Sequence, residues 1–143
     1  MDGVGKPVPF LVTPATEHGA KFSRDGKWLS YSSNESGQYE LYVVAFPGPG
    51  ERRQVSAGGG YLGFWLRTGM GVVFQQDGKL YAIDGVASSV EKPRMLLGGR
   101  ATPLRLVVPS PDGKRLLMPV PIEEDSSALL TVVANWPREL EKK

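Results

Sequence analysis

The residue types that carry most enzyme chemistry are scarce in this 143-residue chain, which has one histidine and no cysteine. Without cysteine there is no thiol nucleophile, no thiolate metal site and no disulfide framework. The single histidine, His18, excludes a multi-histidine metal site and would have to serve alone in any catalytic triad. The sequence therefore predicts no catalytic residue, no metal ligand and no cofactor.

Motifs of the common catalytic domains are also missing. Neither a Gly-x-Ser-x-Gly nucleophile elbow nor the His-Arg-Asp and Asp-Phe-Gly signatures of protein kinases occur. The run 58–63 fits the G-x-G-x-x-G dinucleotide fingerprint, but the apolar run 62–66 predicts a strand where that site requires a helix. Asp25, Asp77 and Asp112 each stand alone before a glycine, without the clustered oxygens that calcium requires. We interpret these aspartates as turn residues, and glycines 58–60 as a crossing between strands.

Polar and aromatic residues in the predicted loops could instead bind a partner. His18 is expected in a loop, as a solvated side chain or as a ligand contact. The full candidate set carries charges of both signs, which suits a protein or peptide better than a polyanion: Glu17, His18, Asn34, Glu35, Tyr39, Tyr61, Arg100 and Arg105. Loops held on a rigid scaffold are a common place for binding residues.

The elements that position these loops repeat along the chain. Residues 22–31, 65–74 and 109–118 each run through a glycine-centred turn into an apolar strand, and the turn glycines Gly26, Gly69 and Gly113 lie 43 and 44 residues apart. A period of about 40–45 residues with several short strands is typical of β-propeller blades. No sustained 3.6-residue apolar period is present, so we expect almost no helix. The sequence predicts an all-β fold of about three four-stranded antiparallel blades.

The repeat also predicts the boundaries of the units. Residues 1–19 form an arm with a separate strand over Pro9–Thr13, followed by blade 1 (20–56), blade 2 (57–97), blade 3 (98–137, without an outer strand of its own) and a charged tail (138–143). Large rings recur at matching places and are expected to fill the space between neighbouring sheets: Phe22, Trp28, Tyr31, Tyr42, Trp65, Phe74, Tyr81 and Trp136.

Residues 22–31, followed by 32–43, resemble the TolB-type propeller repeat, usually written F-S-P-D-G-K-x-(L/I)-A-(Y/F). The likeness extends over about residues 6–137, with departures at Arg24, Thr68 and Pro109. In this form the chain is similar to the C-terminal blades of large bacterial proteins that join propellers to serine/threonine kinase or peptidase modules. The resemblance implies a propeller fold and a periplasmic or extracytoplasmic location, although the chain begins with no signal peptide.

Two functions follow as hypotheses. The first is a non-catalytic binding or scaffold module that engages a protein, peptide or small ligand at the mouth of the propeller channel. The alternative is a regulatory or gating segment of a protein with a kinase or peptidase domain. Basic residues are scattered at a net charge of +2, which argues against nucleic-acid binding, and no apolar run reaches the length of a membrane span.

Because propellers typically close with 4–8 blades, two copies of the chain could complete one six-bladed ring. In this arrangement the strand Phe10–Val12 of each chain would complete the third blade of its partner, and Leu11→Asp would abolish the dimer. The competing account is a fragment of a longer propeller.

Overall fold

The computed structural model describes residues 5–48, 50–66, 71–85, 92–98, 107–110, 115–119 and 130–134. These residues form strands and no helix, and therefore contain no helix that could cross a membrane. The strands are β1 (Glu17–Phe22), β2 (Trp28–Ser33), β3 (Glu40–Ala45), β4 (Arg52–Gln54), β5 (Tyr61–Trp65), β6 (Val72–Gln76), β7 (Lys79–Ile83), β8 (Arg94–Leu97), β9 (Val108–Pro109), β10 (Arg115–Pro119) and β11 (Leu130–Ala134).

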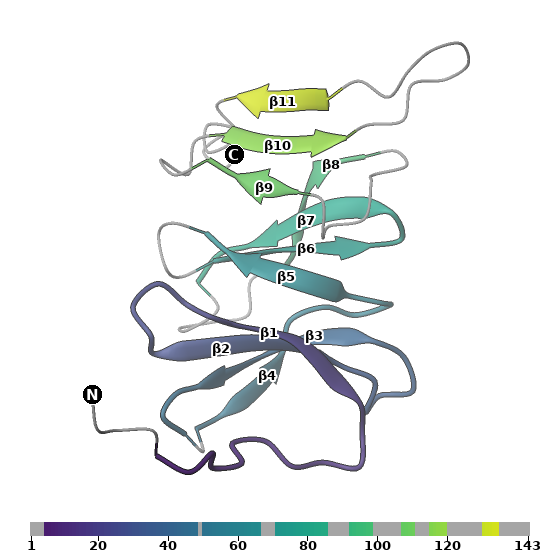
Figure 1. Ribbon diagram of the computed structural model, residues 1–143. Coiled ribbons are helices and arrows are strands. Elements are labelled where there is room, and N and C mark those ends of the chain that lie inside the picture. The colour runs from purple at the N-terminus through teal and green to yellow at the C-terminus, as the bar shows by residue number, and fades with distance from the viewer. Residues whose placement is uncertain are drawn as a thin grey trace.

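The strands make three antiparallel sheets stacked along the chain (Figure 1). Blade 1 is the sheet β1-β2-β3-β4, blade 2 is β5-β6-β7-β8, and blade 3 holds β11-β10-β9 in the part that the structure describes. Each blade is a meander in which consecutive strands are neighbours. This arrangement confirms the predicted all-β fold of propeller-type blades.

The predicted turns at Asp25-Gly26 and Asp77-Gly78 form, whereas Asp112 and Gly113 lie outside the described residues. Between β1 and β2, the Asp25 carboxylate accepts from the Ser23 hydroxyl at 2.6 Å and from the Lys27 N–H at 3.1 Å. The hydrogen bond from Ser23 has the largest effect and that from Lys27 adds to it, so that the pKa of Asp25 lies below its ordinary value. Between β6 and β7, Asp77 and Gly78 adopt φ of 49° and 71°, the left-handed conformation of a tight hairpin turn.

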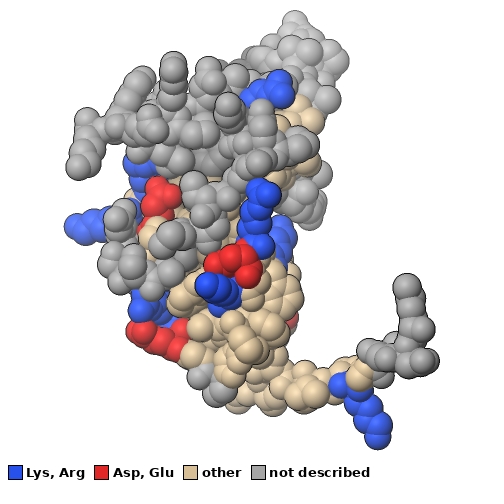
Figure 2. Space-filling view, turned by 90° about the vertical axis from the view of Figure 1, so that its left-hand side faces the viewer, with Lys and Arg blue, Asp and Glu red and all other residues tan. Residues whose placement is uncertain are grey.

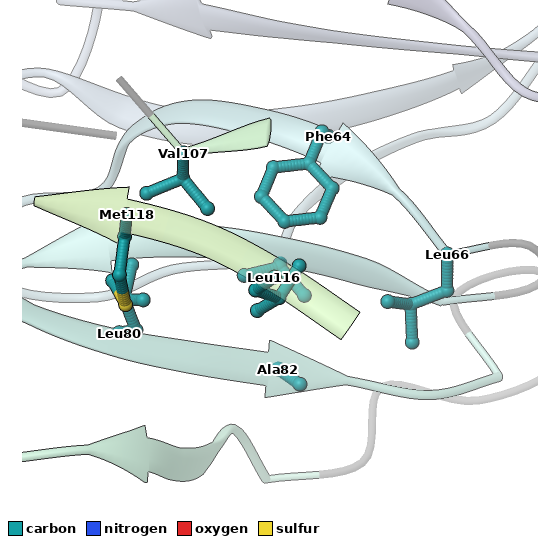
Figure 3. Packing of buried hydrophobic residues seen from close by; sticks show 8 residues of the cluster. Phe64, Leu66, Leu80, Ala82, Val107, Leu116 and Met118 are labelled. Atoms are coloured by element: carbon teal, nitrogen blue, oxygen red, sulfur yellow. The ribbon is translucent and has the colours of Figure 1, made fainter. Parts of the chain in front are cut away.

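The core lies between the sheets. Blade 1 contributes Leu41, Val43 and Val55 to the first interface, where they are buried in one cluster with Val72, Phe74 and Ile83 of blade 2. The second interface joins blades 2 and 3 (Figure 3), and its members are Phe64, Leu66, Val73, Leu80, Ala82, Val107, Leu116 and Met118. Apolar side chains therefore point alternately to the two faces of each sheet, as strand geometry requires.

The aromatic predictions hold in part. Phe74 is buried between two sheets as expected, and Trp65 and Tyr81 pack against the same interface. Tyr31 and Tyr42 are buried too, but on the face of blade 1 that Leu11 contacts and not between two sheets. Phe22 was predicted wrongly as an inter-sheet residue, since 55% of it is exposed. Phe22 comes at the end of β1 beside the hairpin turn, where its ring meets Phe46 at 4.9 Å. Trp136 lies outside the described residues.

Two sequence-based assignments at the N-terminus are wrong. Residues 9–13 form no strand, and β1 begins at Glu17, so His18 lies in a strand rather than in a loop. Pro9 and Pro14 remove two backbone donors from the first segment, whose Leu11 packs instead against the Tyr31, Tyr42 and Val44 cluster of blade 1. β1 starts early because Gly19, at φ 68°, accommodates an irregularity in its pairing with β2.

Candidate functional site

Three of the predicted site residues, His18, Tyr39 and Tyr61, form one aromatic cluster. The His18 ring centroid lies 4.6 Å from that of Tyr39 and 4.8 Å from that of Tyr61, and the two tyrosine rings are 5.6 Å apart. All three pairs meet edge to face, a favourable arrangement for aromatic rings. His18 and Tyr39 are half-buried, while 39% of Tyr61 is exposed. The cluster therefore offers a preformed ring surface to solvent.

The cluster draws on both blades at matching positions. His18 is near the start of β1, the innermost strand of blade 1, and Tyr61 begins β5, the corresponding strand of blade 2. In both strands the pairing register shifts just after the ring residue, between His18 and Lys21 and between Tyr61 and Gly63. Tyr39 immediately precedes β3. His18 and Tyr61, which are 43 positions apart in the sequence, therefore lie at the same end of their blades.

A buried carboxylate fixes the backbone behind this cluster. Glu40 is 1% exposed. Its two oxygens accept hydrogen bonds from the N–H groups of Gly58, Gly59 and Gly60 at 2.8, 2.8 and 3.1 Å. The Ser56 hydroxyl adds a bond at 2.5 Å and the Gln38 side-chain amide one at 2.8 Å. Glu40 follows Tyr39 and Gly60 precedes Tyr61, so this network ties the two tyrosines to one anchor.

The charge of Glu40 is stabilised where it lies. Burial by itself would raise the pKa of this carboxyl, but the hydrogen bonds from Ser56 and from the glycine N–H groups outweigh burial and lower the pKa below its ordinary value of 4.5. A carboxylate that accepts several backbone N–H bonds commonly behaves in this way. The glycine run therefore does bind an anion, but the anion is a side chain of this chain and not a dinucleotide phosphate.

Three other predicted residues lie in a second group beside the N-terminal segment. The Glu17 carboxylate accepts from the Thr13 hydroxyl. Asn34 accepts from the Thr16 N–H at 2.8 Å, and Glu35 forms an ion pair with Arg52 at 2.5 Å. Asn34 and Glu35, with residues 13–15, line a hollow of about 380 Å³. The polar groups of Glu17, Asn34 and Glu35 are therefore engaged by other groups of the chain.

The remaining two predicted residues, Arg100 and Arg105, lie outside the described residues. Within those residues, no three histidine, aspartate or glutamate side chains gather as metal ligands would. Among the described residues on the face that Figure 2 draws, lysine and arginine side chains stand apart from one another, with acidic side chains between some of them.

Sequence reasoning missed Glu40 and Ser56. The signal was present: Glu40 stands within the apolar run 39–45, where strand alternation buries it, and a buried carboxylate requires donors. The glycine run 58–60 supplies three of those donors.

Comparisons with known proteins agree with the fold. No family model matches the chain, and no curated protein matches it in sequence. Among solved structures, TolB from Acinetobacter baumannii superposes with a TM-score of 0.59 at 17% identity, over 86% of this chain and 30% of that one. A protein assigned as TolB from Agrobacterium tumefaciens gives 0.63 at 14% identity, over 87% of this chain and 47% of that one.

An oligogalacturonate lyase from Vibrio parahaemolyticus is also similar, with a TM-score of 0.61 at 16% identity over 76% of this chain and 31% of that one. The chain thus spans less than half the length of each of these structures. Their likeness, at such low identity, concerns the fold. Together with the three stacked sheets and their period, it shows that the chain has the fold of TolB-type β-propeller blades.

Proposed function

We propose that this chain is a non-catalytic binding module that engages a protein or peptide at the blade end carrying His18, Tyr39 and Tyr61. The observation that supports this function is the aromatic cluster itself: three rings from two blades, in edge-to-face contact and partly open to solvent. Partly exposed tyrosines provide a large contact area with little conformational entropy to lose, and they are enriched in protein interfaces.

The network around Glu40 supports the same function. A binding surface gains affinity when its groups are held in place before the partner arrives. Here a buried carboxylate fixes the backbone next to Tyr39 and Tyr61. The mixture of acidic and basic side chains on the surface also favours a protein or peptide over a polyanion (Figure 2).

Peptide selection tests this function. A phage-displayed library of random dodecapeptides is selected on the wild-type protein, and the enriched peptides are titrated against Tyr61→Ala and Phe22→Ala. Both residues are exposed aromatics, but Phe22 lies at the opposite end of β1. We expect binding to weaken at least about tenfold with Tyr61→Ala and to be unchanged with Phe22→Ala. Peptides that bind all three proteins equally, or no enrichment at all, would contradict the proposed function.

A second candidate ligand comes from the similar lyase, whose name states that it acts on oligogalacturonate. Aromatic rings can also stack on sugars, so the same titration is run with oligogalacturonate as the probe. Binding of this saccharide that depends on Tyr61, in the absence of peptide binding, would replace the peptide with a carbohydrate as the ligand.

A further inference from the structure

Blade 1 has a second apolar face, which points away from blade 2 and is formed by Tyr31, Tyr42 and Val44. Tyr31 and Tyr42 are cross-strand partners with stacked rings 5.7 Å apart. In blade 2 the same positions are held by Phe74 and Tyr81, also cross-strand partners and stacked at 5.8 Å. The two blades therefore carry the same kind of face.

In blade 2 this face is a blade–blade interface. Phe74 and Ile83 are fully buried there against Leu41 and Val43 of blade 1. Because Tyr31 corresponds to Phe74 and Val44 to Ile83, blade 1 presents on its other side a surface shaped to receive a further blade.

That surface is covered: Tyr31, Tyr42 and Val44 are 2%, 3% and 4% exposed, and the N-terminal segment (residues 5–16) lies against them. Leu11 packs against the cluster, but its neighbours Val8 and Val12 are 84% and 81% exposed. The segment therefore covers this face mainly through Leu11, whereas a blade would cover it with a whole sheet.

The complementary face lies at the other end of the stack (Figure 1). Val108 and Leu117 of blade 3 are 55% and 38% exposed. Counting 44 positions back, they correspond to Phe64 and Val73 of blade 2, which are buried against blade 3. Blade 3 therefore exposes the apolar positions that blade 2 uses to hold the next blade.

We propose that the Tyr31, Tyr42 and Val44 face docks the Val108 and Leu117 face of a second copy, and that the N-terminal segment is a displaceable cap over it. Reciprocal docking would close two chains into one ring, as a two-fold assembly allows. This inference does not depend on the proposed binding function. It predicts the opposite effect of Leu11 on dimerisation from the strand-exchange hypothesis. Here Leu11 opposes association of the two chains, whereas in strand exchange Leu11 is needed for it.

The test measures the dimer dissociation constant by light scattering after size exclusion, over a range of protein concentrations. A dimer has twice the 15.5 kDa mass of one chain. Leu11→Asp should lower the dissociation constant by about tenfold or more, because a competing state is removed. Adding Leu117→Asp to that variant should raise the constant again by at least as much. Val8→Asp, which alters an exposed residue of the same segment, is the matched control and should change nothing.

Three results would overturn the proposal. Loss of the dimer with Leu11→Asp would establish strand exchange in its place. A dimer that persists unchanged with Leu117→Asp would show that another surface is used, and monomers in every variant would show that the faces do not dock. Circular dichroism verifies folding, and Leu11→Ala, which should act in the same direction, replaces Leu11→Asp if the aspartate variant unfolds.

Discussion

At the scale of single residues, Glu40 has the most demanding environment in the described chain. It holds a charge at 1% exposure and accepts hydrogen bonds from five donors. Burying a charge is unfavourable unless it is fully hydrogen-bonded. Here four of the five donors come from the crossing between blades 1 and 2, and the fifth is Gln38, just before β3. The residue thus links the local conformation of the glycine run to the packing of two sheets.

Replacing Glu40 should reveal this link. We expect Glu40→Gln to lower the free energy of unfolding by about 2–3 kcal/mol, because the amide NH₂ would face N–H donors that lose their acceptor. Urea unfolding followed by tryptophan fluorescence measures the effect. Glu51→Gln is the control: Glu51 is exposed and pairs with Arg53 at the surface, so its replacement should leave the stability nearly unchanged.

The same residue predicts a pH dependence. The pKa of Glu40 is lower in the folded chain than its ordinary value of 4.5, so its contribution to stability is present above pH 4.5 and is lost as the pH falls toward the folded pKa. We expect the free energy of unfolding of the wild type to decrease below about pH 4.5, and to decrease less steeply in Glu40→Gln. Equal slopes in urea titrations of the two proteins would contradict this assignment.

At the scale of elements, the inner strand β5 lies unusually close to its neighbours. A Cβ atom added at Gly63 would come within 2.9 Å of a Val72 methyl and 3.0 Å of a Leu41 methyl. The indole of Trp65, at the other end of β5, donates to the Lys21 carbonyl of β1 at 2.9 Å. The inner strands of the two blades are therefore in direct contact, which is what allows His18 and Tyr61 to meet.

This close approach predicts the effect of the smallest side chain. Gly63→Ala should reduce the free energy of unfolding by about 1–3 kcal/mol through overpacking between β5 and blade 1. It should also shift the ring resonances of His18 and Tyr61, measured by NMR. Gly5→Ala, at a position with nothing within 4 Å, is the matched control and should change stability by less than about 0.5 kcal/mol. Unchanged stability and unchanged ring resonances in Gly63→Ala would contradict the prediction and would mean that β5 can shift to accommodate the methyl group.

At the scale of the whole molecule, the chain is a stack in which each sheet contacts mainly its neighbours (Figure 1). In such a repeat architecture the stability is approximately a sum of blade terms and interface terms. The two internal interfaces are buried, whereas the outer face of blade 3 exposes Val108 and Leu117.

The stacked arrangement predicts that the same substitution, leucine to alanine, changes the free energy of unfolding by different amounts at different positions. Leu80→Ala, in the interface between blades 2 and 3, should destabilise the chain by about 2–5 kcal/mol because it leaves a cavity. Leu117→Ala, on the outer face of blade 3, should cost less than about 1 kcal/mol in the monomer. Chemical unfolding at low protein concentration measures both. Similar costs for the two leucines would contradict the stacked arrangement.

The sequence by itself determined the class of the fold. Strand alternation, Asp-Gly turns and a 43- to 44-residue period are local or repeating signals, so the strands from β2 to β8 and their turns could be located without coordinates. The sequence-based prediction was wrong at residues 9–18, where it placed a strand over 9–13 and a loop at His18. The outcome there depends on which part of the chain covers blade 1. That choice depends on packing between distant parts of the chain.

Only the tertiary structure decided how the site is assembled. The predicted loop residues included His18, Tyr39 and Tyr61 together with five others, and nothing in their spacing singles out the three that meet. The pairing of Glu40 with glycines 18 to 20 residues later depends on how the crossing folds back over β3. Side-chain contacts between sheets depend on register and sheet packing, which no local pattern specifies.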